Sequence, residues 1–64
     1  MNNDAHLALK RLRKRVLRER AFYRKVQTEK FSRTGVQDER LFGEINVCDI
    51  VIGMIDKEME RVVR

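Results

Sequence analysis

The second half of the chain carries an apolar repeat that strongly constrains the fold. Its apolar residues recur at alternating steps of four and three residues, and they are Leu41, Ile45, Cys48, Ile52, Ile55, Met59 and Val62. This spacing places all seven side chains on one face of an α-helix. The 64 residues include no proline, so no proline interrupts such a helix. The repeat therefore predicts a long helix over about 37–63.

A β-strand over 45–55 is the alternative for the same segment, because it is rich in the β-branched residues Val and Ile. Strict alternation of apolar and polar residues fails at 47–48 and at 50–52, which disfavours the strand. Gly43 and Gly53 are the weak points of the helix, because each costs about 1 kcal/mol relative to alanine. Gly43 could split the helix in two. It leaves open a separate short helix over 36–42.

The first half shows a second helical pattern, broken by one acid. The residues that share its apolar face are Ala5, Leu9, Leu12, Val16, Tyr23 and Val26. Glu19 occupies the remaining position of that face, between Val16 and Tyr23. Two interpretations of Glu19 stay open: it reaches an arginine such as Arg15 or one of another subunit, or it is solvated at the edge. The pattern predicts an amphipathic helix over about 4–31.

The turn between the two helices is predicted over 32–36. This segment holds the only cluster of small and turn-forming residues, and Gly35 can adopt the positive φ that ends many helices. Thr34 and Gln37 have the spacing of a capping box for the second helix. Residues 1–64 are therefore expected to form a single all-α domain, an antiparallel helical hairpin whose two apolar faces meet.

Length and composition argue against an enzyme. A chain of 64 residues leaves little room for a walled active site. One cysteine cannot form an internal disulfide, and one cysteine with one histidine cannot complete a tetrahedral zinc site. Cys48 is at an inward position and is expected to be an inert thiol, while His6 is expected on a polar face. We expect no enzymatic activity, no cofactor and no small-molecule substrate.

Positive charge is concentrated in the first half. Residues 1–33 have a net charge of +8 and residues 34–64 a net charge of −3, and nine of the sixteen residues over 10–25 are basic. The candidate binding residues are Lys10, Arg11, Arg13, Lys14, Arg15, Arg18, Arg20, Arg24 and Lys25, together with Phe22, which could stack on unpaired bases. Such a surface attracts nucleic acid or an acidic protein. The alternative is a solvated face neutralised by the acidic second helix.

The second helix carries further apolar residues outside its main repeat, namely Val47, Ile50, Val51 and Met54. A helix that is apolar on two sides is usually buried on both. We therefore expect self-association through these four residues, most simply as a two-fold homodimer that forms a helical bundle. The surface of a partner protein, or a local contact with a third helix, is the alternative.

The sequence favours a cytoplasmic location. No export signal is visible at its start. The longest nearly apolar stretch, over 47–55, is broken by Asp49 and Gly53 and is too short to span a membrane. A lone thiol fits a reducing compartment. Association of the basic helix with an anionic membrane surface ranks third among the hypotheses, because the apolar face is modest and lacks tryptophan.

The chain also resembles a known group of proteins. Its Met-Asn-Asn start and its segments LKRLRKR, ERAFYRK, GVQDERLFGEI and MIDKEME are similar to the small accessory proteins from the early region of lambdoid phages, between the recombination and excision genes. The resemblance implies a small helical protein that acts in an infected bacterial cytoplasm on phage development or on the host cell cycle. It supplies no catalytic motif and assigns a role to no residue.

Together these features predict a non-enzymatic accessory or regulatory protein that binds nucleic acid through an arginine-rich helix. The alternative is a protein-interaction modulator of a host factor, which the resemblance favours because small early phage proteins commonly bind host machinery.

Overall fold

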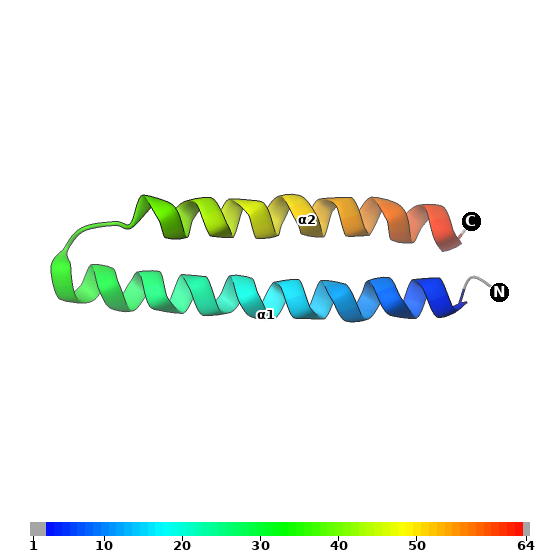
Figure 1. Ribbon diagram of the computed structural model, residues 1–64, viewed down its shortest axis with the longest axis horizontal. Helices are drawn as coiled ribbons and strands as arrows, with labels where there is room; N and C mark the ends of the chain where they lie inside the picture. Colours follow the sequence, from blue (N-terminus) through cyan, green and yellow to red (C-terminus); the bar gives the residue numbers. More distant parts are fainter. Residues whose placement is uncertain (1–2, 64) are drawn as a thin grey trace.

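The protein is an all-α helical hairpin. The structure, a computed structural model, describes residues 3–63. Helix α1 spans Asn3–Thr34 and helix α2 spans Glu39–Val63. The two helices run antiparallel and pack along their length, so that the start of α1 lies beside the end of α2 in a rod 51 Å long (Figure 1). The predicted fold class is confirmed, and the segment 45–55 is helix rather than strand.

Helix α2 packs on α1 through the predicted repeat. Ile45, Cys48 and Ile55 are buried. The other members of the repeat are half-buried, namely Leu41, Ile52, Met59 and Val62. Helix α2 continues without a break through Gly43, so a separate helix over 36–42 is wrong. A single glycine costs only about 1 kcal/mol in a helix, which the packing of the repeat offsets.

The face that α1 turns toward α2 differs from the predicted one. Its half-buried residues are His6, Leu9, Arg13, Val16, Arg20, Tyr23, Val26 and Gln27. Ala5 is exposed, and Leu12 retains 44% of its accessible surface. The prediction was therefore correct for Leu9, Val16, Tyr23 and Val26 and wrong for the other two. The prediction that His6 lies on a polar face was also wrong.

Two ion pairs explain why α1 is rotated away from its predicted face. Arg13 Nε donates to Asp56 Oδ1 at 2.8 Å, and Arg20 Nε donates to Asp49 Oδ1 at 2.6 Å. The arginines are seven residues apart on α1 and the aspartates seven residues apart on α2, so both pairs obey one antiparallel register. Both arginines are half-buried, as expected where an apolar stem packs on a neighbouring helix while the charged end reaches an exposed acid.

Helix α1 ends later than predicted. Residues 32–34 are helical, and the connection between the helices comprises residues 35–38. The Thr34 hydroxyl donates to the carbonyl oxygen of Lys30 at 2.8 Å, within the last turn of α1. Gly35 has a φ of 70°, and its N–H donates to the carbonyl oxygen of Phe31 at 2.7 Å. Gly35 is thus the left-handed residue that ends α1.

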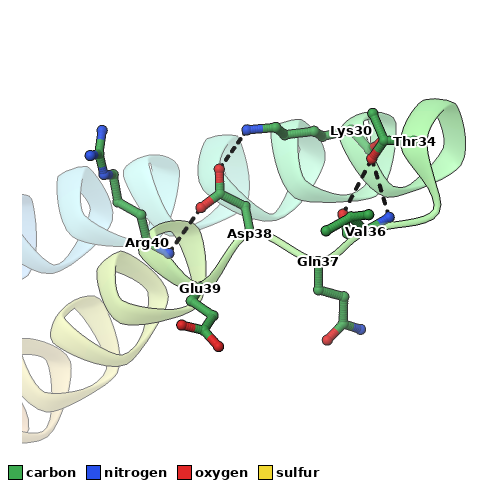
Figure 2. A pocket seen from close by; sticks show the side chains of 7 residues that line it. All are labelled: Lys30, Thr34, Val36, Gln37, Asp38, Glu39 and Arg40. Carbon is green, nitrogen blue, oxygen red and sulfur yellow. Dashed lines mark hydrogen bonds and ion pairs between the residues drawn. The ribbon is translucent and has the colours of Figure 1, made fainter.

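Asp38 caps the start of α2, and the predicted capping box of Thr34 and Gln37 is wrong. Asp38 Oδ1 accepts from the backbone N–H of Arg40 at 2.9 Å, and Oδ2 accepts from Lys30 Nζ at 2.6 Å (Figure 2). The Thr34 hydroxyl instead accepts from the backbone N–H of Val36 at 3.2 Å. A carboxylate forms the stronger cap because it also interacts with the positive end of the helix dipole. Asp38 therefore fixes both the start of α2 and its attachment to α1.

Candidate nucleic-acid interface

Seven of the nine basic residues that were predicted to bind a partner lie exposed on α1, away from its contact with α2. We call them the basic ridge, and they are Lys10, Arg11, Lys14, Arg15, Arg18, Arg24 and Lys25. Because α1 is one uninterrupted helix, residues three, four and seven positions apart are neighbours on its surface. From Lys10 to Lys25 the ridge extends over about 22 Å at 1.5 Å per residue.

Arg13 and Arg20 do not belong to the ridge. Both were predicted to bind a partner, but each is half-buried against α2 and paired with an aspartate. These pairs could have been predicted from the sequence. Asp49 and Asp56 each follow an inward residue of the repeat, and their separation equals that of the two arginines. The fold therefore divides the nine basic residues of 10–25 into two paired residues and seven exposed ones.

Within the part of the chain that the structure describes, the acids of α2 form no ion pair with the ridge. Among residues 3–63, the ion pairs join Arg13, Arg20 and Lys30 to aspartates near or on α2, and Arg61 to Glu58 within α2. No ridge residue forms an ion pair within that range. Glu19 is exposed and likewise pairs with no described arginine, including Arg15. Within a single copy of the chain, Glu19 is therefore solvated and forms no ion pair with a described arginine.

Phe22 and Tyr23 differ in exposure, as the sequence predicted. Phe22 lies among the ridge residues with 61% of its surface exposed, whereas Tyr23 is half-buried against α2. The two rings are 5.9 Å apart at 64°, an edge-to-face arrangement. Nearby Glu44, followed by partial burial and Glu19, raises the pKa of the Tyr23 hydroxyl. Phe22 is thus the aromatic ring that a ligand on the ridge can reach.

Neither Cys48 nor His6 has the surroundings of a reactive group. Cys48 is buried, and burial together with the negative charges of Glu19, Glu44 and Asp49 raises the pKa of its thiol. A raised pKa disfavours the nucleophilic thiolate. His6 is half-buried in the helix contact, where its Nδ1 lacks a hydrogen-bond partner. Residues 3–63 contain no group of three His, Cys, Asp or Glu side chains that could hold a metal ion.

Surface hollows lie at the turn and beside α1. The hollow at the turn is open to solvent, and there Lys30, Thr34 and Asp38 form hydrogen bonds with one another or with the backbone (Figure 2). The hollow beside α1 is lined by Leu7, Lys10, Arg11 and Lys14 at the start of the ridge. Three cations around a depression suit an anionic group better than a neutral one.

Of the four predicted self-association residues of α2, three are exposed, whereas Val51 is half-buried like Ile52 and Met59 of the helix contact. Val47, Ile50 and Met54 are exposed over 55%, 62% and 63% of their surface, and Val51 is half-buried. The hairpin therefore leaves this second apolar surface open.

Comparison of the chain with known proteins finds no match to a family model, to a curated protein or to a solved structure. Within residues 3–63, neither helix combines the length and the apolar character that crossing a membrane requires.

Proposed function

We propose that this protein is a non-enzymatic accessory or regulatory protein that binds nucleic acid through the basic ridge of α1. One observation carries the proposal. Seven cationic side chains are exposed on one helix, while Asp49 and Asp56 of α2 are engaged by Arg13 and Arg20, which lie outside the ridge. These two aspartates are thereby paired outside the ridge, and no described residue forms an ion pair with a ridge residue.

The chemistry of the ridge favours the phosphate backbone over base edges. Four of its residues are arginines, whose guanidinium groups can bind phosphate oxygens in a bidentate manner. At a rise of 3.4 Å per base pair, a ridge of about 22 Å faces roughly seven base pairs. Binding then releases counterions from the nucleic acid and weakens as salt is added. Sequence-specific base contacts are not part of the proposal.

Phe22 extends the proposal to single strands. It follows Arg18 by four residues and precedes Lys25 by three, so its exposed ring lies between two cations on the helix surface. In single-strand binders, bases stack on such rings while neighbouring cations hold the backbone.

Fluorescence anisotropy with a labelled 12-base-pair duplex and a 12-nucleotide single strand tests the proposal. The variant combines Arg11→Gln, Lys14→Gln and Arg18→Gln. The matched control combines Arg33→Gln, Arg40→Gln and Arg61→Gln, which removes the same charge outside the ridge. Affinity should fall more than about tenfold in the ridge variant, since each lost phosphate contact matters at low salt. Equal losses in both variants, or no binding of wild-type protein at low salt, would reject the proposal.

A protein-interaction modulator of a host factor is the second candidate. It is favoured by the exposed apolar side chains of Leu7, Leu17 and Phe31 beside the cations of α1, because such side chains add affinity for proteins rather than for phosphates. On either candidate, and in line with the resemblance to early phage proteins, we place the activity in a bacterial cytoplasm. Binding to an acidic protein that survives nuclease treatment, with no binding to either oligonucleotide, would favour this second candidate.

A further inference from the structure

Phe22 lies at a boundary between positive and negative charge on the surface of α1. Arg18, one turn before it, and Lys25, one turn after it, lie about 40° and 60° to one side around the helix. Glu19 lies about 60° to the other side, which is the side of half-buried Tyr23 and of the contact with α2. Phe22 and the three charged residues are exposed. An exposed aromatic ring is thus flanked by two cations on one side and by an acid on the other.

The hairpin brings a second acid to the side of Glu19. Tyr23 packs edge-to-face on Phe22, with the ring centroids 5.9 Å apart. Glu44 of α2, followed by partial burial and Glu19, raises the pKa of the Tyr23 hydroxyl. Burial, Glu19 and Glu44 likewise raise the pKa of the Cys48 thiol. The two carboxylates therefore lie within electrostatic reach of the same two groups, beside the ring of Phe22.

The carboxylate of Glu19 is available to a ligand. Glu19 is exposed, and within residues 3–63 it forms no ion pair, even with Arg15 one turn before it. An ionised carboxylate accepts hydrogen bonds and donates none. The group therefore favours a ligand that presents N–H groups at the edge of the Phe22 ring.

A nucleotide of a single strand has the same polarity as this surface. Its phosphates are attracted by Arg18 and Lys25 and repelled by the two acids, so the strand backbone is directed to the cationic side of Phe22. A base stacked on the ring then turns its edge toward Glu19.

The edges of the four DNA bases differ in what they offer to a carboxylate. Cytosine, adenine and guanine carry an exocyclic amino group, which donates hydrogen bonds. Thymine has no amino group, and its one N–H lies between two carbonyl oxygens that repel a carboxylate. Glu19 therefore discriminates against thymine.

We propose that Phe22 and Glu19 form a base subsite, which selects single-stranded bases with an exocyclic amino group over thymine. Phe22 stacks on the base, and Glu19 accepts a hydrogen bond from its amino group. Arg18 and Lys25 bind the neighbouring phosphates. The inference rests on the proposed function and adds one base contact to the phosphate contacts of the ridge. A duplex does not make this contact, because its bases are already stacked and paired.

Fluorescence anisotropy with labelled 12-nucleotide oligo(dC) and oligo(dT), at mildly alkaline pH and low salt, tests the subsite. The two strands carry the same charge and consist of pyrimidines, so the ratio of their affinities reports the contact with the base. Wild-type protein should bind oligo(dC) about fivefold more tightly than oligo(dT). Glu19→Gln should bring the two affinities within about twofold of each other, because an amide can accept from cytosine and donate to thymine.

Two further variants complete the test. Glu29→Gln is the matched control, because it removes the same charge from an exposed position of α1 seven residues after Phe22, and it should keep the wild-type ratio. Phe22→Ala should weaken the binding of both strands by about fivefold or more and abolish the preference. All three positions are exposed, so the variants should keep the helical circular dichroism spectrum of wild type.

The outcomes separate the subsite from the proposed function. Equal binding of the two strands by wild-type protein would overturn the subsite and leave the phosphate contacts of the ridge untouched. A preference for oligo(dC) that survives Glu19→Gln or Phe22→Ala, or that is lost in Glu29→Gln, would do the same. Binding of neither strand by wild-type protein would instead reject single-strand binding by the ridge, and the subsite with it.

Discussion

Asp38 connects the two helices at the level of a single side chain. One carboxylate oxygen caps α2 through the backbone N–H of Arg40, and the other accepts from Lys30 of α1. The Lys30 hydrogen bond, helped by the backbone N–H groups of Arg40 and Leu41, holds the pKa of Asp38 below its ordinary value. The ionised carboxylate of Asp38 is therefore more stable in the folded chain than in the unfolded one.

This shift predicts a specific pH dependence. A lowered carboxyl pKa contributes stability above the unfolded value of about 3.9, and this contribution is lost as the pH falls through the lower folded value. Asp38→Asn keeps a capping oxygen but not the charge. It should melt at a lower temperature than wild type at pH 7, and the gap should close toward pH 2. Glu60→Gln, which changes an exposed acid of α2, should follow the wild-type profile. A gap that stays constant from pH 7 to pH 2 would contradict this role.

Arg20 occupies a position of the helix contact where an apolar residue would pack better. It is half-buried between Val16 and Tyr23 on the inner face of α1, and its partner Asp49 is exposed. Ion pairs of this exposure contribute at most about 1 kcal/mol. The pair therefore fixes the register of the hairpin more than it stabilises it.

Arg20→Leu should accordingly raise the free energy of unfolding, by about 1 kcal/mol, because leucine packs on the α2 repeat and Asp49 remains hydrated. The control is Arg18→Leu, the same change at an exposed ridge position. It should leave stability within about 0.5 kcal/mol of wild type. Urea unfolding followed by circular dichroism at one protein concentration measures both. A loss of stability in Arg20→Leu would show that the ion pair outweighs apolar packing.

At the scale of the elements, the glycines play two different roles in the helices: one ends α1, and two lie inside α2. Gly35 ends α1 with a φ of 70°, a conformation that residues with a Cβ rarely adopt. Gly43 and Gly53 are within α2, where the backbone is helical and open space surrounds the position of a Cβ. Only at position 35 does the backbone conformation therefore require glycine.

The same substitution should thus have opposite effects at two sites. Gly53→Ala should stabilise the protein by about 1 kcal/mol, because alanine is the better helix former. Gly35→Ala should destabilise it by about 1 kcal/mol, since its Cβ is strained at positive φ. Thermal unfolding of the two variants beside wild type checks both signs. Stabilisation by Gly35→Ala would mean that α1 does not end as described.

The two helices also differ in how far their packing could be predicted from sequence. The repeat of α2 is apolar at every position, and all seven of its members are buried or half-buried as predicted; Val51, which was predicted to lie outside the repeat, is half-buried as well. On α1 the apolar residues and the inward residues coincide only in part, because Arg13 and Arg20 take inward positions that Leu12 and Glu19 were expected to hold. Single-helix periodicity carries no information on partners across the interface. Those partners, Asp49 and Asp56, decide the rotation of α1.

At the scale of the whole molecule, folding sorts the cations of α1 by role. The sequence alone identified the basic segment correctly, and it presented all nine cations as equivalent. The fold assigns Arg13 and Arg20 to α2 and leaves seven residues exposed. Separating the two sets requires the register of the hairpin, which depends on contacts between residues more than 25 positions apart. The central claim is therefore that the exposed set, and not the paired set, meets a polyanion.

The slope of log affinity against log salt concentration tests this claim most directly, because it counts the phosphates that a protein neutralises. Wild-type protein and two single variants, Arg18→Gln from the ridge and Arg13→Gln from the paired set, are titrated with one duplex between 50 and 200 mM KCl. Both variants remove one positive charge, and only Arg18 is free to contact phosphate. The account predicts a slope smaller in magnitude by about one for Arg18→Gln and the wild-type slope for Arg13→Gln. Equal slopes for the two variants, or a larger change for Arg13→Gln, would contradict it.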